Sequence, residues 1–157
     1  MPALADPPTE TREAYVARWR AAVTGLWAEV EAWAAAHGWE TERVTLRHTE
    51  AGPPAGQQLH LIAPPADRLP EWGRKERIAL HAGEPAPDEW REPGEEIGVG
   101  VDYIPDPVYG SLERDDRGWW WTGPDLRRGK FVPWTPDDIP RILALFRAES
   151  AKIGPWA

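Results

Sequence analysis

A stripe of apolar residues with helical spacing covers the first quarter of the chain. The apolar positions recur at intervals of three and four, as on one face of a helix, at Tyr15, Trp19, Ala22, Leu26, Val30 and Trp33. Thr9 or Thr11 can cap the start of this helix, and Gly38 suits the left-handed residue that follows a helix end. About 27 residues at ~1.5 Å each span about 40 Å. We therefore expect the helix to cross a sheet and to overhang one edge or pair with a partner there.

Alternation with a period of two replaces this stripe after residue 38 and predicts a run of short strands. In the first strand, Val44 and Leu46 share one face and Arg43 lies on the other. Loops rich in Gly and Pro separate the strands, and no helical pattern lies between them, so the strands must pair antiparallel. The expected strands are residues 39–48, 57–63, 74–81, 96–104, 108–114, 119–122 and 130–134.

The motif Thr135-Pro136-Asp137-Asp138 predicts the start of a second helix. Threonine is a capping residue, proline fits the first helical position, and two aspartates suit the positive end of the helix. Gly154-Pro155 should end it. Its buried stripe is expected at Ile139, Ile142, Leu143 and Phe146.

These patterns predict an α+β fold. It consists of a long N-terminal helix, an antiparallel meander of about five to seven strands, and a C-terminal helix. Both helices should lie on one face of the sheet, because that arrangement buries both apolar stripes and leaves the second face partly open. Residues 1–8 are expected to be a disordered, Pro-rich lead-in, and residues 9–157 a single domain, as the length of 157 residues suggests.

Composition narrows the class of protein. The chain has no Cys, which excludes disulfides and thiolate metal sites. It lacks a membrane-spanning apolar run and a signal-peptide pattern, so a cytoplasmic location is the expectation. Eleven Trp residues are unusual. They favour either a Trp-built core or an aromatic recognition surface.

Charge is unevenly distributed along the chain. The formal net charge is −8, and residues 84–116 carry 11 acidic side chains against only Arg91 and Arg114. A net negative protein repels duplex nucleic acid, so no such partner is expected. The acidic segment is either a solvated surface or a docking face for a basic protein.

The hairpin around Trp119-Trp120-Trp121 is the most distinctive stretch. Trp119 and Trp121 should share one sheet face and Trp120 the other. Arg127 and Arg128 follow from the same hairpin. Rings beside cations can stack on a nucleotide, a sugar or single-stranded bases. The structural alternative is that the helices and loops cover both faces of the hairpin.

Catalytic signals are weak. Asp102 and Asp106 flank Tyr103 and could divide acid and base roles, but turn chemistry explains Asp106 between two prolines equally well. His48 and His60 could meet across a hairpin, yet no close-spaced ligand motif accompanies them, so we expect no metal and no cofactor. Gly98 and Gly100 lie inside a strand, where glycines admit a packed helix or the backbone of a bound partner.

Three functions remain. The first is a small cytoplasmic, non-catalytic protein-binding module of the immunity-protein, antitoxin or chaperone-like class. It would dock a protein partner, a basic one or a second copy of the chain, through its open sheet face, Trp hairpin and acidic loops. The second is a binder of a small ligand, nucleotide or single-stranded nucleic acid, and the third is a carboxylate-dependent hydrolase. The candidate binding residues are Trp119, Trp121, Arg127, Arg128, Trp90, Asp102, Tyr103, Asp106 and Tyr109.

Overall fold

The computed structural model describes residues 11–47, 49–52, 54–64, 76–83, 97–104 and 107–153. The expectations for the lead-in, Thr9, His48, Trp90, Asp106 and the helix stop at Gly154 lie outside these residues. The elements are α1 (Arg12–His37), β1 (Glu40–Arg47), β2 (Pro54–Ile62), β3 (Arg77–Gly83), β4 (Ile97–Ile104), β5 (Tyr109–Asp115), β6 (Gly118–Thr122), β7 (Val132–Pro133), the 3-10 turn η1 (Pro136–Asp138) and α2 (Ile139–Ile153).

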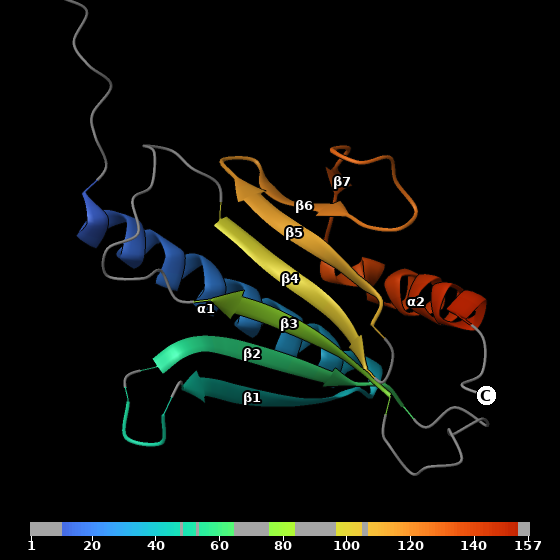
Figure 1. The fold of residues 1–157 in the computed structure, drawn as a ribbon, viewed down its shortest axis with the longest axis horizontal. Helices are drawn as coiled ribbons and strands as arrows, with labels where there is room; N and C mark the ends of the chain where they lie inside the picture. Colours follow the sequence, from blue (N-terminus) through green and yellow to red (C-terminus); the bar gives the residue numbers. More distant parts are fainter. Residues whose placement is uncertain are drawn as a thin grey trace, which may run out of the picture.

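The seven strands form one sheet in the order β1-β2-β3-β4-β5-β6-β7, and every neighbouring pair is antiparallel. Both helices lie on the same side of the sheet, with α1 crossing behind the first strands and α2 behind the last (Figure 1). The predicted α+β fold, a meander with two helices on one face, is therefore confirmed. We call the helix-covered side the inner face and the opposite side the outer face.

The ends of α1 follow the sequence signals. The hydroxyl of Thr11 accepts a hydrogen bond from the Ala14 backbone N–H at 3.1 Å. Gly38 takes a left-handed conformation with φ of 77°, and its N–H donates to the Ala34 carbonyl. Threonine and glycine thus fix where this helix starts and stops.

The start of α2 differs in detail from the expectation. One 3-10 turn precedes the α-helix, and the Asp138 carboxylate accepts from the Thr135 backbone N–H at 3.0 Å. Pro140 has no N–H to give to a carbonyl four residues earlier, so the α-helical hydrogen bonds can start only after it. The turn is closed instead by Asp138 N–H donating to the Thr135 carbonyl at 2.9 Å.

The core fills the space between the inner face and the two helices. Phe146 of α2 is fully buried and places its ring 5.8 Å from Tyr103 and 6.0 Å from Trp121, centroid to centroid. Trp27 of α1 is also fully buried. Trp residues therefore build much of the core, as one of the two sequence interpretations predicted. The other fully buried large side chains include Leu26, Leu59, Leu61, Ile78, Leu80, Ile97, Leu112 and Ile142.

Two strands depart from the simple alternation. In β1, Arg43 points to the inner face, where its Nε donates to Glu31 of α1 at 3.1 Å, while Val44 and Leu46 lie on the outer face. An edge strand tolerates this because long polar side chains there reach solvent. The strand expected at 130–134 shrinks to Val132–Pro133, because a turn with Gly129 at φ 82° and Lys130 N–H bonded to the Arg127 carbonyl holds the chain away from β6.

Candidate functional site

The outer face is the first candidate site, and its rows follow from the strand register. Residues that pair across strands point to the same face, so side chains far apart in the chain form continuous rows. One row contains Glu42, His60, Ala79, Asp102 and Tyr109. The next contains Val44, Gln58, His81, Gly100, Ser111 and Thr122.

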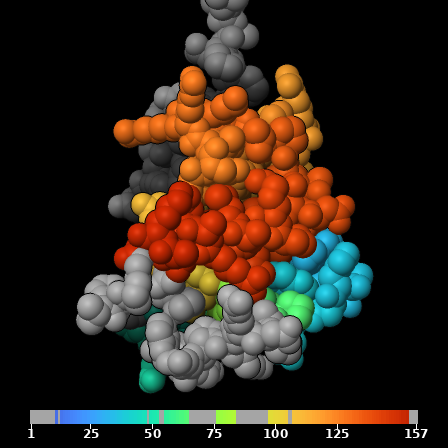
Figure 2. Space-filling model, turned by 90° about the vertical axis from the view of Figure 1, so that its right-hand side faces the viewer, coloured from blue at the N-terminus to red at the C-terminus, as the bar shows by residue number. Residues whose placement is uncertain are grey.

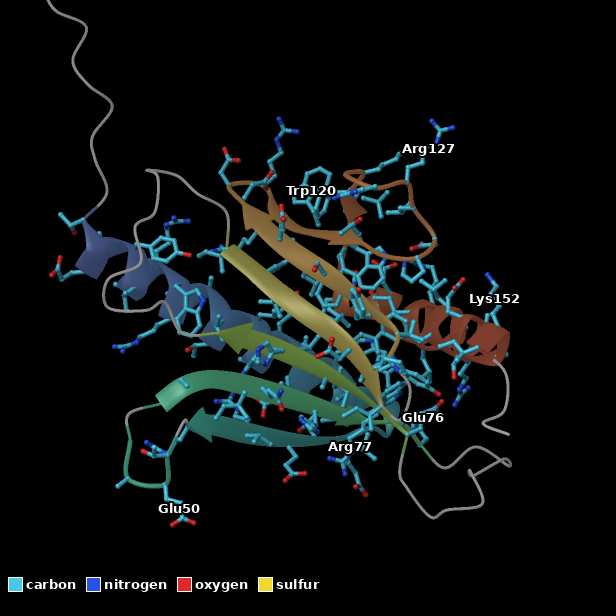
Figure 3. All side chains as sticks on the ribbon, viewed as in Figure 1. Glu50, Glu76, Arg77, Trp120, Arg127 and Lys152 are labelled. Carbon is cyan, nitrogen blue, oxygen red and sulfur yellow. The ribbon has the colours of Figure 1, made fainter. Side chains whose placement is uncertain are left out.

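A chain of side-chain hydrogen bonds crosses the two rows. Arg77 Nη1 lies 3.0 Å from His60 Nδ1, and His60 Nε2 lies 2.9 Å from Gln58 Oε1. Gln58 Nε2 lies 3.1 Å from His81 Nδ1. Arginine can only donate, so His60 must accept at Nδ1 and donate from Nε2. The Gln58 amide then donates to His81 Nδ1, so the series of hydrogen bonds ends at His81, whose other ring nitrogen is Nε2. Figure 3 labels Arg77, where this chain begins.

The environment of His60 fixes the donor-to-acceptor order of these side-chain hydrogen bonds. Burial lowers the pKa of His60 below its ordinary value, and the charge of Arg77 lowers it further, against a smaller opposing effect of Glu42. A proton on Nδ1 would face the Arg77 donor and break the chain. Because the neutral ring is favoured, the outer face presents fixed polar groups at neutral pH.

Replacing Gln58 with leucine tests whether the chain contributes to stability. The His60 donor and the His81 acceptor would lose their shared partner while still half-buried. We expect the free energy of unfolding to fall by about 1 kcal/mol, measured by urea denaturation. Replacing Thr45, an exposed residue on the inner side of β1, with leucine is the control, and equal values for both variants would contradict the expectation.

Glycines leave the middle of the outer face without projecting side chains. A Cβ atom built on Gly98 would meet nothing within 4 Å, and one on Gly100 would meet only His81, at 3.8 Å. The described residues place no helix over these glycines (Figure 1). Of the two uses considered for glycines on one strand face, a packed helix is therefore not what this part of the chain shows.

The outer face is acidic. Its strand positions carry five carboxylates, at Glu40, Glu42, Asp102, Glu113 and Asp115, against two guanidinium groups. These are Arg77 and, past the irregularity at the end of β1, Arg47, which pairs with Pro54. The Arg77 Nη1 atom lies 3.8 Å from Glu42, so part of the positive charge is already neutralised. Half-buried apolar side chains border the charges at Val44, Leu46, Ile62, Ile104 and Trp120.

The Trp hairpin divides between the two faces as predicted. Trp121 is fully buried on the inner face, and its indole N–H donates to Asp125 Oδ1 at 3.2 Å. Trp119 packs half-buried against the same core, while Trp120 lies on the outer face. The enclosed ring of Trp121 contributes packing rather than a surface for a ligand.

A groove beside β5 is the second candidate site. It has a volume of about 560 Å³ and lies between the start of β5, the segment after β6 and the C-terminal turn of α2. It brings together two of the predicted binding residues, Tyr109 and Arg128. Figure 2 shows this side of the molecule, with α2 in red against the orange residues of β6 and the segment after it. The other lining residues include Pro107, Ser111, Thr122, Pro124, Leu126, Glu149, Lys152 and Ile153.

The remaining candidates do not converge with these. Arg127 is exposed outside the groove lining. Asp102 points outward and its neighbour Tyr103 inward, where the Tyr103 hydroxyl donates to Glu76. Sequence reasoning missed Gln58 and His81, because their contact depends on the register between β2 and β3. It also missed Lys152 and Ile153, since residues near a helix end carry no signal of what packs beside them.

Within the described ranges, no group of three or more His, Asp or Glu side chains could hold a metal ion. None of the described helices is long and apolar enough to cross a membrane. Comparison with protein-family models, with curated proteins and with solved structures gives no match. Function must therefore be argued from the two candidate sites themselves.

Proposed function

We propose that this chain is a non-catalytic protein-binding module that docks a basic protein on its outer face. One observation carries the proposal: five carboxylates outnumber two arginines on a sheet face over which the described residues place no helix. Complementary charge steers association and selects partners. A face with one dominant sign of charge is thus suited to a partner of the opposite sign.

The shape of the outer face supports a protein partner over a small molecule. The low strip at Gly98 and Gly100 is open and lies between half-buried apolar side chains and fixed polar groups. The hydrogen-bond chain from Arg77 to His81 holds its side chains in place before any partner arrives. Groups that are already ordered lose less conformational entropy on binding.

Charge reversal on the outer face tests the proposal. The double variant Glu42→Lys/Asp102→Lys should recover about tenfold less of its basic protein partners than the unchanged chain, because steering depends on the sign of the field. Proteins captured from a lysate of the source cells are quantified by mass spectrometry for each bait. The matched control is Glu29→Lys/Asp137→Lys, which makes the same charge change at exposed positions away from the outer face.

The proposal requires that the control bait keep the partners that the outer-face variant loses. Equal recovery by all three baits would refute it, as would captured proteins that are acidic. Thermal unfolding of both variants confirms that each bait is folded.

A further inference from the structure

The groove beside β5 contains the exposed large hydrophobic side chains of the described surface. Among the described residues, two large hydrophobic side chains are exposed: Tyr109 at 70% and Ile153 at 51%. Both line the groove. Its volume of about 560 Å³ falls within the roughly 300–1,000 Å³ of ligand sites. Exposed apolar groups gathered in one concavity indicate a binding site rather than chance exposure.

The groove also runs along a sheet edge that β6 leaves open. Backbone groups on one strand point alternately to its two neighbours. The Val108 carbonyl accepts from Tyr103 N–H of β4 at 2.8 Å, so the N–H and C=O of Tyr109 point the other way. Pairing with β6 begins only at Ser111, opposite Thr122, after which the chain turns away at Gly123. Tyr109 therefore offers a strand donor and acceptor to the groove.

Charge completes the site. Arg128 and Lys152 both line the groove. Lys152 is paired with Glu149, with 2.7 Å between Nζ and Oε1, while Arg128 has no ion pair with any described residue. A guanidinium in this position is suited to a carboxylate, which it can bind through two parallel hydrogen bonds.

We propose that the groove binds an extended peptide segment that ends in, or carries, a carboxylate. The peptide pairs as a short added strand with Tyr109, rests apolar side chains on Tyr109 and Ile153, and places its carboxylate at Arg128. Peptide addition at a free strand edge takes its affinity from main-chain hydrogen bonds. The free backbone edge favours a peptide over a nucleotide, because a nucleotide has no main chain to match it. The groove shares Tyr109, Ser111 and Thr122 with the edge of the outer face. Its carboxylate site at Arg128 uses none of the outer-face carboxylates, so either proposal can fail alone.

A labelled peptide tests the site. The probe is fluorescein-labelled Thr-Val-Thr-Val-Asp with a free C-terminal carboxylate, and its counterpart is Thr-Val-Thr-Val-Asn amide. Fluorescence anisotropy should show the acid binding with a Kd on the order of 0.1 mM and the amide at least tenfold more weakly. Arg128→Glu should weaken binding of the acid about tenfold, while the neighbouring Arg127→Glu, outside the groove lining, should change it less than twofold.

Two variants at Tyr109 separate the backbone from the side chain. Tyr109→Ala removes the ring, and Tyr109→Pro also removes the N–H that points into the groove. We expect proline to be tolerated here, because that N–H has no bond to β4. We expect Tyr109→Pro to bind several-fold more weakly than Tyr109→Ala, and the peptide to shift the amide resonances of Gly110, Gly123 and Lys152. Any one of four results overturns the proposal: no saturation by about 5 mM peptide, equal loss for Arg127→Glu and Arg128→Glu, shifts centred on Gly98 and Gly100, or tighter binding of ATP or oligo-dT than of the peptide.

Discussion

Replacing Trp121 with alanine should lower the free energy of unfolding by about 3–5 kcal/mol. The side chain is fully buried at the junction of β5, β6 and α2. Its ring lies so close to Gly110 and Gly123 that a Cβ atom at either glycine would come within 2.3 Å of it. Removing the ring leaves a cavity under two residues that have no side chains to fill it. Urea denaturation measures the loss.

Two further variants show that position, not residue type, causes the effect. Trp120→Ala removes the same side chain one residue away, from the outer face, and should cost less than about 2 kcal/mol, because less apolar area leaves contact. Trp121→Phe keeps an aromatic ring but loses the N–H that bonds Asp125. Its cost in unfolding free energy should lie between those of Trp121→Ala and Trp120→Ala. A cost for Trp121→Ala no greater than that for Trp120→Ala would contradict the assignment of Trp121 to the core.

Local rules predicted most of the fold. The alternation from Ile97 to Tyr103 set the inner face of β4, and Gly38 fixed the end of α1. The same alternation placed Trp119 and Trp121 together, away from Trp120. These features succeed because each depends on neighbours in the sequence or on a period of two. The short β7 was harder, since a turn around Gly129 competes with a strand for the same residues.

The candidate sites were predicted less completely, because they depend on contacts between distant segments. Arg128 and Tyr109 were each chosen for residue type, but only packing places them in one groove with Ile153. The bond between Gln58 and His81 requires the register of β2 and β3, which joins residues 23 apart. No spacing rule reports such contacts.

The carboxylate of Glu76, the residue before β3, joins α2 to the sheet. Arg147 of α2 donates to Glu76 through Nε, at 2.8 Å, and through Nη2, and the Tyr103 hydroxyl donates to the same carboxylate. The Glu76 side chain is 15% exposed. Figure 3 labels Glu76 beside the start of β3. Losing the charge weakens three hydrogen bonds to one group, so Glu76→Gln should lower the free energy of unfolding by about 1.5–3 kcal/mol at neutral pH.

The cost of Glu76→Gln should depend on pH. Burial acts to raise the pKa of Glu76, but hydrogen bonds from Arg147 and Tyr103 outweigh it, and the folded-state pKa lies below the ordinary value of 4.5. A carboxyl with a lowered pKa stabilises the fold fully above that ordinary value, and the stabilisation is lost as pH falls through the folded-state pKa. The difference between the unchanged chain and Glu76→Gln should therefore be constant from pH 8 to about pH 5 and shrink below it.

The control lies on the same helix. Glu149→Gln removes an ion pair to Lys152, whose side chain is 71% exposed, and should change stability by less than about 0.5 kcal/mol at every pH. The comparison is measured by urea denaturation at intervals from pH 3 to pH 8. If the loss of unfolding free energy caused by Glu76→Gln stays constant down to pH 3, the negative charge of Glu76 is not what stabilises its contact with α2. A cost that vanishes at low pH assigns the contact between α2 and Glu76 to the ionised carboxylate, because glutamine keeps the size of the side chain but lacks its charge and replaces one acceptor oxygen with an NH2 donor.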